Sequence, residues 1–375
     1  MIGPRYTDLA ASLPASVPFV GPEAQERTRG TAFKARLGAN ESVFGPSPKA
    51  VEALAEAARG AWMYGDPEAF DLRTALARYE GVAPENIVIG EGIDGLLGLL
   101  VRLLVAPGDA VVTSAGAYPT FNYHVAGFGG VLHQVPYRDD YEDPAALIAK
   151  ARAVDAKLIY IANPDNPMGT WHDPAVLHQM VGAVPEGCVL ALDEAYAQFL
   201  TPGGLARMDA AHPRVIRLRT FSKAYGLAGA RVGYAIGAPD LIKSFDKVRN
   251  HFGVNRLGQA AALAALDDEA YLSTVVAQVA LARERIAAIA AENGLTTLPS
   301  AANFVAVDCG QDGAFARRVL AALIERGLFV RMPFVAPQDR CIRISAGRAD
   351  DLDVFAETLP KALAAATATA DAKAT

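Results

Sequence analysis

The sequence predicts an α/β protein with a large domain, built on a mostly parallel, doubly wound sheet, and a smaller α+β domain. Six short runs predict strands because they are apolar at consecutive positions: residues 86–90, 110–114, 157–164, 188–196, 214–222 and 231–237. Such runs are typical of parallel strands that are covered on both faces. Helical patterns such as "DGLLGLLVRLLV" lie between most of these runs. The alternation of the two patterns predicts the doubly wound sheet.

The length of 375 residues is enough for two domains. An Ala- and Leu-rich helical pattern begins at Arg256, and shorter strand and helix patterns follow it. We therefore expect a large domain over residues 39–255 and a small domain over residues 256–367. Residues 1–38 are rich in Pro and Ala, and we expect this arm to pack on the small domain or on a partner subunit. The low-complexity tail, residues 368–375, is expected to fray.

The bulk composition argues against several classes of protein. The net charge is −6 and the pI about 5.6, which does not fit a protein that binds nucleic acid or anionic membranes. The three cysteines, Cys188, Cys309 and Cys341, are far apart, as in a reduced cytoplasmic protein. The N-terminus has no signal-peptide pattern, and no apolar run is long enough to span a membrane.

The stretch "IGEGIDG" follows a predicted strand and begins a helix. Gly90, Gly92 and Gly95 fit the glycine spacing of a dinucleotide-binding turn, so an NAD-dependent dehydrogenase is one alternative. That fold also needs an acid after the second strand, and "VVTSAGAY" contains none. The free N–H groups of Gly92, Ile93 and Asp94 still suit a single phosphate. The alternative that these glycines only turn a tight corner stays open.

Two further strand ends carry polar residues. Asp193 ends the apolar run "VLALD", and ligands of open α/β sheets bind at this end of the strands. The rigid loop "NPDNPMG" follows another strand and directs Asn166 toward the same edge. The alternative for Asp193 is a solvated acid at the end of a strand, and the alternative for "NPDNPMG" is an ordinary turn between a strand and a helix. The chain has no Gly-Lys pair of a nucleotide hydrolase, and its six histidines show no metal-binding spacing.

The stretch "TFSKAYGLAGARVGY" completes the set, and one ligand accounts for all of it: pyridoxal 5′-phosphate. Its aldehyde needs an amine, which Lys223 provides, and its pyridine nitrogen needs a carboxylate such as Asp193. Its phosphate needs hydroxyls and a cation in addition to backbone amides. Thr220, Ser222 and Arg231 are the candidates.

At this point the chain resembles the fold-type I, pyridoxal-phosphate-dependent aminotransferases, and within them it is most similar to the histidinol-phosphate aminotransferase family. The resemblance runs from "ANESVFGPSP" at residues 39–48 to "CIRISAG" at residues 341–347. The motifs between them follow the family's order: "YGDPEAFDLR", "GEGID", "YPTFNYH", "NPDNPMG", "DEAY", "TFSKAYGLAGARVGY", "ANFV" and "VRMP". Each motif is weak alone, and the ordered set carries the resemblance.

The resemblance implies a role for each matching residue. Lys223 resembles the Schiff-base lysine that moves the substrate proton, and Asp193 the partner of the pyridine nitrogen. Asn166 and Tyr196 match the groups that bind the ring's 3′-oxygen. The remaining matches are Phe121, or less favourably Tyr123, for ring stacking, and Gly92, Ile93, Asp94, Thr220, Ser222 and Arg231 for the phosphate. Tyr64 resembles the tyrosine that reaches the phosphate of the neighbouring subunit, which implies a homodimer with shared sites.

The resemblance also implies the substrates. Arg343 resembles the arginine that binds the α-carboxylate, and Arg331 lies where the family holds a distal anionic group. The expected reaction moves an amino group between histidinol phosphate, or an aromatic or aliphatic amino acid, and a 2-oxo acid such as 2-oxoglutarate. Gly95, Asp165 and Met168 depart from the family's usual residues, and Gly95 and Met168 could reshape the pocket, which leaves the substrate open. A pyridoxal-phosphate decarboxylase is the enzymatic alternative. A cofactor-sensing regulator would need a DNA-binding domain, for which no residues remain.

Overall fold

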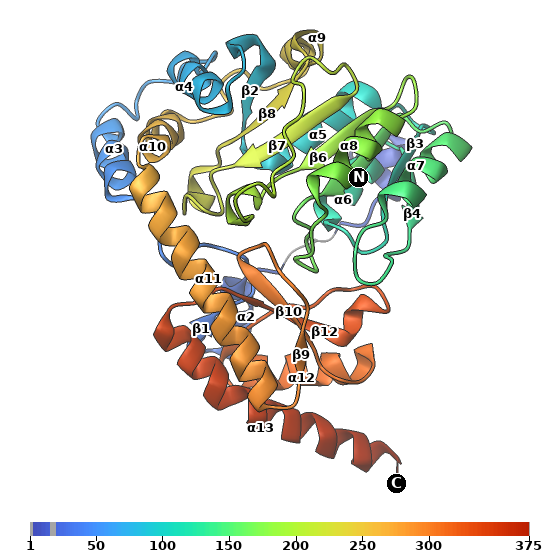
Figure 1. Ribbon diagram of the computed structural model, residues 1–375, viewed down its shortest axis with the longest axis vertical. Coiled ribbons are helices and arrows are strands. Elements are labelled where there is room, and N and C mark those ends of the chain that lie inside the picture. Colours follow the sequence, from blue (N-terminus) through green and yellow to red (C-terminus); the bar gives the residue numbers. More distant parts are fainter. Residues whose placement is uncertain (1–2, 16–19, 375) are drawn as a thin grey trace.

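A seven-stranded sheet forms the centre of the larger lobe in a computed structural model that describes residues 3–15 and 20–374 (Figure 1). The strand order is β2-β8-β7-β6-β5-β3-β4. The strands are β2 (Ile87–Gly90), β3 (Ala110–Ser114), β4 (Val131–Val135), β5 (Leu158–Ala162), β6 (Val189–Asp193), β7 (Val215–Thr220) and β8 (Gly233–Gly237). β8 is antiparallel to both of its neighbours, and the other pairs are parallel. The predicted α/β class with a mostly parallel sheet is confirmed.

One strand was absent from the prediction. β4 lies at the edge of the sheet and pairs only with β3 in the described part of the chain. Its sequence "VLHQV" is mostly exposed or half-buried, unlike the fully buried β5 and β6. The criterion of a continuous apolar run therefore detects the central strands and misses this edge strand.

Helices cover both faces of the sheet. α5 (Gly92–Leu104) and α6 (Pro119–Gly127) pack on one face, together with Ala191 of β6 and Leu218 of β7. The opposite face is covered by α7 (Pro144–Ala153), α8 (Pro174–Ala183), α4 (Phe70–Glu80) and α10 (Arg256–Leu266). α3 (Pro48–Ala58) packs on α10, and α9 (Pro239–Ser244) lies beside β2 and β8. Since side chains alternate along a strand, Asp193 shares the α5 and α6 face with Ala191, and Glu194 points to the other face.

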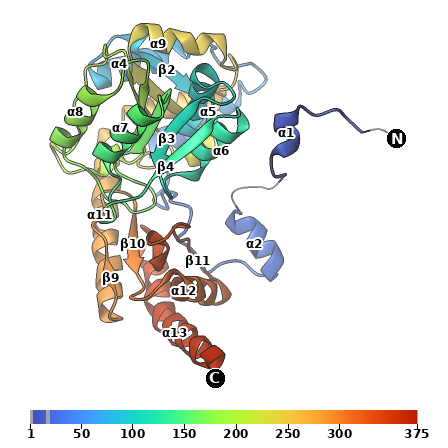
Figure 2. The ribbon, with the colours of Figure 1, turned by 90° about the vertical axis from the view of Figure 1, so that its right-hand side faces the viewer.

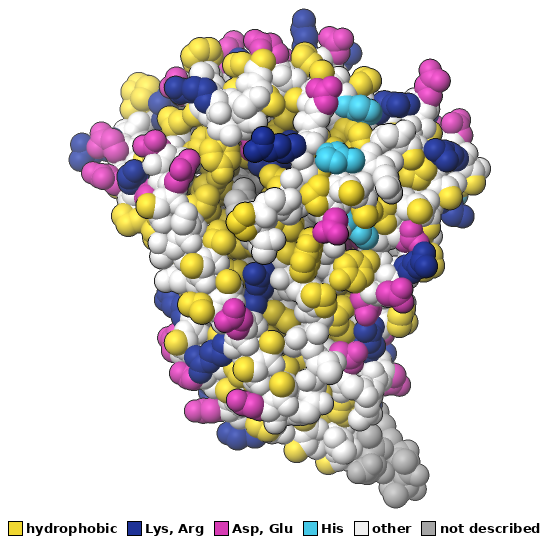
Figure 3. All heavy atoms as spheres, in the orientation of Figure 1, with side chains coloured by type: hydrophobic (Ala, Val, Ile, Leu, Met, Phe, Trp, Pro, Cys, Tyr) yellow, Lys and Arg dark blue, Asp and Glu magenta, His cyan; other side chains and the backbone are white. Residues whose placement is uncertain are grey.

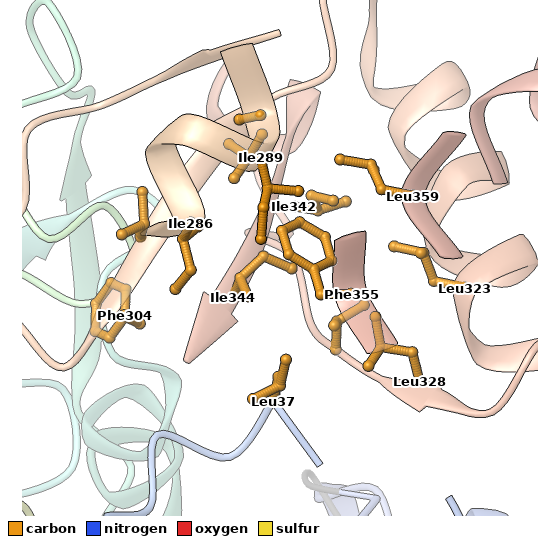
Figure 4. Packing of buried hydrophobic residues seen from close by; sticks show 14 of the residues in the cluster. Leu37, Ile286, Ile289, Phe304, Leu323, Leu328, Ile342, Ile344, Phe355 and Leu359 are labelled. Carbon is orange, nitrogen blue, oxygen red and sulfur yellow. The ribbon is translucent and has the colours of Figure 1, made fainter. Parts of the chain in front are cut away.

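The smaller lobe surrounds a second, antiparallel sheet. Its strand order is β12-β10-β9, with β9 (Thr296–Thr297), β10 (Phe304–Asp308) and β12 (Cys341–Ser345). The helices are α11 (Glu269–Glu292), α12 (Gly313–Glu325) and α13 (Ala349–Ala374). Figure 4 shows Ile286 of α11, Ile342 of β12 and Phe355 of α13 meeting in the core of this lobe. α11 is the long helix that leads from the larger lobe into the smaller one (Figure 1).

The N-terminal segment contributes to the smaller lobe. β1 (Ala35–Arg36) pairs in parallel with β11 (Leu328–Phe329), and Leu37 enters the core of the lobe. α2 (Pro22–Arg29) is tied to β1 because Arg36 forms ion pairs with Glu23 and Glu26. α1 (Asp8–Ser12) has no buried residue, and it lies to the side of both lobes in Figure 2.

The C-terminal helix is longer than the sequence indicated. α13 continues to Ala374, so the backbone is helical through most of the segment 368–375 for which we expect fraying. The segment is rich in alanine, the residue with the highest helix propensity, which favours this continuation.

The described residues add three further observations. None of the described helices combines the length and apolar character that a membrane crossing requires. On the face shown in Figure 3, Lys and Arg side chains are interspersed with Asp and Glu, in keeping with the small negative net charge. No group of three potential metal ligands occurs among the described residues.

Candidate functional site

A cavity of about 240 Å³ lies where the carboxyl ends of β5, β6 and β7 meet the N-terminus of α5. Open α/β sheets bind ligands in the crevice outside the carboxyl ends of their strands, and this cavity lies at that position. Most of the residues selected in the sequence line this cavity: Ile93, Asp94, Asn166, Asp193, Tyr196, Thr220, Ser222, Lys223 and Arg231. The fold therefore brings together side chains that are far apart in the chain.

Asp193 ends β6 and is buried on the floor of this cavity. Its two carboxylate oxygens accept hydrogen bonds from the Tyr160 hydroxyl (2.8 Å) and the Ala195 amide (2.9 Å). No ion pair to Asp193 occurs within the described residues. Burial raises the pKa of this carboxyl to about 6, because the charged form is poorly solvated. A cationic or N–H donor group in the cavity would find a strong acceptor here.

Lys223 follows β7 and faces the same cavity. Its Nζ donates to the backbone carbonyl of Asn40 at 3.2 Å and lies 5.8 Å from the centre of the Tyr196 ring. Burial lowers the pKa of this amine to about 8, and the positive charge of Arg343 acts in the same direction. A lysine with a lowered pKa has more free amine near neutral pH, as an amine nucleophile requires.

One end of the cavity is suited to an anion. Thr220 Oγ1 and Ser222 Oγ are 2.9 Å apart and both face the cavity, as do Ile93 and Asp94 in the first turn of α5. The helix N-terminus contributes backbone N–H groups and the positive end of its dipole. Arg231 adds a guanidinium at the same end.

The close approach of Arg231 to α5 depends on a glycine. Gly92 has φ +78°, and a Cβ atom at this position would lie 2.7 Å from Arg231 Nη2. Arg231 itself has φ +56° and donates to the carbonyls of Ala228 (3.0 Å) and Glu91 (3.3 Å). Gly92 therefore has a steric reason to be glycine, and the guanidinium is fixed beside the helix N-terminus.

Tyr196 and Asn166 meet above the floor of the cavity. The Tyr196 hydroxyl accepts hydrogen bonds from Asn40 Nδ2 (3.1 Å) and from Asn166 Nδ2 (3.5 Å). Burial raises the pKa of Tyr196. Asn166 Oδ1 in turn accepts from Arg343 Nη1. Asn40 is not among the predicted site residues, although it lies in the stretch "ANESVFGPSP".

A second cavity of about 220 Å³ adjoins the first and shares Lys223 and Asn166 with it. Arg331 and Arg343 both line this space, on neighbouring backbone segments that form an antiparallel bridge. Burial lowers the pKa of Arg343 to about 10, and its Nε is buried without a hydrogen-bond partner. Arg343 forms no ion pair with a carboxylate of the described chain. Two guanidinium groups in this arrangement are suited to an anionic ligand.

Neither of the two aromatic residues expected to stack on the cofactor ring lines either cavity. Phe121 is fully buried in the core, where its ring stacks on Tyr160 with 4.6 Å between ring centres, and it does not line the cavity. Tyr123, the weaker choice, is 53% exposed on α6. Tyr118, which was not selected, lines both cavities. The first turns of α6 direct Phe121 toward the sheet, where it packs in the core. Tyr118 precedes the helix, and its side chain lines the two cavities.

None of the three departures from the family pattern lines either cavity. Met168 is fully buried and packs with Ala306 and Cys341, so it does not shape the ligand space. A Cβ atom on Gly95 would meet the side chain of Glu91 at 3.2 Å. Asp165 is buried below Asn166, and it accepts hydrogen bonds from the Tyr137 hydroxyl and the Met168 amide, each at 2.9 Å.

Tyr64 lies outside both cavities of its own chain. It is 77% exposed, and its ring lies 4.8 Å from that of Phe252, which is also exposed. Trp62, Met63 and Phe70 are exposed in the same part of the chain. We call the exposed Tyr64–Phe252 pair, together with these exposed residues close to Tyr64 in the sequence, the aromatic patch.

The comparisons with known proteins agree with this geometry. The family model described as aminotransferase class I and II matches residues 34–359. The histidinol-phosphate aminotransferase of Moorella thermoacetica is 35% identical over 365 residues, which cover 96% of this chain and 94% of the relative.

Two solved structures extend the comparison. Histidinol-phosphate aminotransferase from Sinorhizobium meliloti, in complex with pyridoxal-5′-phosphate, is 52% identical with a TM-score of 0.94, covering 97% of this chain and 98% of that one. Aspartate aminotransferase from Thermus thermophilus with maleate is 24% identical with a TM-score of 0.80, covering 97% of this chain and 100% of that one. At this identity the second likeness concerns the fold alone.

Proposed function

Because the chain belongs to the family of class I and II aminotransferases, we propose that it is a pyridoxal 5′-phosphate-dependent aminotransferase acting on histidinol phosphate or a similar amino compound. The amino acceptor is a 2-oxo acid such as 2-oxoglutarate. The observation that carries the proposal is one cavity that holds an amine of lowered pKa, a buried carboxyl that has no ion-pair partner among the described residues, and a helix end suited to an anion. The comparisons support neither the decarboxylase nor the dehydrogenase alternative.

The residues of the cavity fit this cofactor. When bound, pyridoxal phosphate supplies an aldehyde that condenses with amines and a protonated pyridine ring that withdraws electrons from the substrate Cα. Asp193, buried and hydrogen-bonded only to neutral donors, holds a proton on a ring nitrogen. Gly92 leaves the space in which Arg231 approaches the helix N-terminus, and Thr220 and Ser222 add hydroxyl groups for the phosphate.

The remaining residues orient and exchange protons. Lys223 would hold the cofactor in the resting enzyme, and its amine would remove and return the proton at the substrate Cα. Tyr196 and Asn166 would bind the ring's 3′-oxygen, and Tyr118, which lines the cavity where Phe121 does not, would cover the ring face. Arg343 binds the carboxylate of the 2-oxo acid, and Arg331 holds the distal anionic group.

We also propose that the enzyme is a homodimer. The aromatic patch supports this proposal, since large exposed aromatic side chains in one region are typical of interaction surfaces. Tyr64 of each subunit would reach the phosphate in the other subunit. The three cysteines are buried and free, in keeping with a cytoplasmic enzyme.

A visible absorption spectrum of the purified protein tests the cofactor. A pyridoxal phosphate bound to a lysine absorbs near ~420 nm. A colourless protein that remains so after incubation with pyridoxal phosphate contradicts the proposal.

The substrate is tested with Arg331→Ala. Losing one charge-assisted partner of a phosphate costs roughly 1.5–3 kcal/mol, so kcat/KM for histidinol phosphate should fall at least ~10-fold. The loss should be small for a neutral aliphatic amino acid. Arg285→Ala, an arginine on α11 outside both cavities, is the control. Equal losses for both substrates, or no activity of the unmodified enzyme toward histidinol phosphate, favour a general amino-acid aminotransferase.

A further inference from the structure

Asn40 combines three unusual features. It has φ +55°, a left-handed conformation that few residues other than glycine adopt, and it is only 2% exposed. It also lies in the loop that leads from β1 in the smaller lobe to α3 on the larger lobe. Backbone strain at a buried polar residue is a reason to look for a function.

Asn40 is fixed from the side of the smaller lobe. Its backbone N–H donates to Ser345 Oγ (3.0 Å), and the same hydroxyl donates to Asn40 Oδ1 (3.1 Å). Asn303 Nδ2 donates to the Asn40 carbonyl at 3.0 Å. Ser345 ends β12 and Asn303 directly precedes β10, so both partners belong to the sheet of this lobe.

The carbonyl oxygen and the side-chain Nδ2 of Asn40 also contact residues of the candidate active site. The Asn40 carbonyl accepts from Lys223 Nζ at 3.2 Å, and Asn40 Nδ2 donates to the Tyr196 hydroxyl at 3.1 Å. Every polar atom of Asn40 therefore has a partner. One residue connects the sheet of the smaller lobe with both the reactive amine and the ring-binding tyrosine.

The direction of the hydrogen bond to Tyr196 has a chemical consequence. A phenol hydroxyl has one proton and can accept two hydrogen bonds. Since the Tyr196 oxygen accepts from both Asn40 and Asn166, its proton is left to point into the cavity. The amide donor also stabilises negative charge on the phenol, and it lowers the pKa of Tyr196 against the larger, opposite effect of burial.

We propose that Asn40 is a positioning residue for transamination, which directs the Tyr196 proton at the bound cofactor and holds the amine of Lys223 through its backbone carbonyl. The inference rests on the proposed function. Glycine would suit the backbone angle but would leave Tyr196 without this donor. Aspartate tolerates the angle but presents an acceptor, so Tyr196 would turn its proton toward residue 40 and away from the cavity.

The test is a pH titration of the visible absorption of the cofactor-loaded protein. A Tyr196 proton directed at the ring's 3′-oxygen stabilises negative charge there and favours the deprotonated chromophore. Asn40→Gly should therefore raise the midpoint of the absorption change by about half to one pH unit, the effect of losing one hydrogen bond. Asn40→Asp should raise it at least as far.

Two controls separate positioning from general disturbance. Asp155→Gly alters another left-handed residue, which is exposed before β5, and should leave the midpoint unchanged. The acetylation rate of Lys223 in the cofactor-free protein, measured by mass spectrometry, should be the same for Asn40→Gly and the unmodified protein. This is because glycine keeps the backbone carbonyl that binds Nζ.

The outcomes distinguish the two proposals. A midpoint that stays within about 0.2 pH units in both Asn40 variants overturns the role of Asn40, even if the protein is a fully active aminotransferase. An unmodified protein without a visible cofactor band overturns the proposed function itself. If one Asn40 variant does not fold, the other decides the question.

Discussion

Asp193 and Glu194 are consecutive, equally buried acids on opposite faces of the same sheet, and their surroundings differ completely. Among the described residues, Asp193 has only a tyrosine hydroxyl and a backbone amide as hydrogen-bond partners, and burial raises its pKa. Burial also acts to raise the pKa of Glu194, but the charges of Arg219 and Arg217 more than offset it and hold that pKa below its usual range. One carboxyl is therefore left available for a ligand, and the other is neutralised by the fold.

The difference separates stability from chemistry. On the Glu194 face, Arg219 binds Glu194 (2.8 Å) and Glu80 of α4 (2.7 Å), and Tyr234 also donates to Glu80 (2.7 Å). This network joins β7, β8 and α4. On the Asp193 face, neither Lys223 nor Asp193 forms an ion pair with another described residue. We expect substitutions on the first face to destabilise the fold and those on the second to remove activity.

The largest expected effect is on the cavity face. Lys223→Ala should abolish turnover, because no other described amine lines the cavity to exchange the substrate proton. The folded-state pKa of Lys223 is lowered to about 8, so this lysine lowers stability below pH 8, and that cost is relieved as the pH rises toward 10.5.

The unfolding temperature of the cofactor-free variant should therefore not fall at pH 7. Lys150→Ala, an exposed lysine on α7, is the control for turnover. A Lys223 variant that keeps measurable transamination, or that unfolds well below the unmodified protein, would break the comparison.

Arg219→Ala tests the opposite face. Removing one partner of a buried ion pair typically costs about 3–5 kcal/mol, because Glu194 and Glu80 lose a buried positive charge. Chemical denaturation measures this loss, and the folded fraction should keep its kcat. Arg59→Ala, which breaks an exposed pair with Glu56, should change stability by less than about 1 kcal/mol. A similar small effect of Arg219→Ala would mean that the network does not stabilise the fold.

In contrast to Arg219→Ala, Asp193→Asn should lower activity and leave the stability of the fold intact. The amide cannot hold a protonated pyridine nitrogen, so kcat should fall by the equivalent of ~3 kcal/mol or more, about 100-fold. The pKa of Asp193 is raised from 3.8 to about 6, so its contribution to stability is present below pH 3.8 and lost as the pH rises through 6. The cofactor-free variant should therefore be at least as stable as the parent at pH 8. Less than a tenfold loss in kcat would remove Asp193 from the reaction.

The two faces also differ in how much the sequence reveals. The central strands and the polar residues at their ends, Asp193, Asn166 and Lys223, follow from local patterns, since burial and strand ends leave a local signature. The partners of Glu194 are not local, because Glu80 reaches Arg219 across 139 positions of the chain. Asn40 was not predicted as a site residue for the same reason. Its contact with Lys223 spans 183 positions of the chain and is made by a backbone carbonyl, which leaves no signal in the sequence.

Side-chain direction marks a second limit of the sequence. The motif "YPTFNYH" offers three aromatic residues within six positions, and only the start of α6 decides which one faces the cavity. Family resemblance selected Phe121, whereas the structure places Tyr118 at the cavity and Phe121 in the core. The edge strand β4 was missed because it is partly exposed, so its composition differs from that of the central strands.

A third buried acid sharpens the comparison. Asp165 lies next to Glu142, a fully buried carboxyl that accepts hydrogen bonds from Ser114 Oγ (2.6 Å) and the Ala162 amide (2.9 Å). No cation forms an ion pair with either acid among the described residues. Burial raises both pKa values, that of Asp165 to about 6. The pair thus resembles Asp193 in its electrostatics, but neither acid lines the cavities.

Asp165→Asn should therefore change stability without removing activity, and this change in free energy should be smaller than the main effect expected of each of the other three substitutions on activity or stability. Since the folded-state pKa of Asp165 is raised, its contribution to stability is present below about pH 4 and lost as the pH rises through 6. The variant should be more stable than the parent by on the order of 1–3 kcal/mol at pH 8 and no more stable at pH 4. Unfolding temperatures measured from pH 4 to 8 follow this difference. A gain that is equal at both pH values would show that packing, rather than an uncompensated carboxyl, distinguishes the parent from the variant.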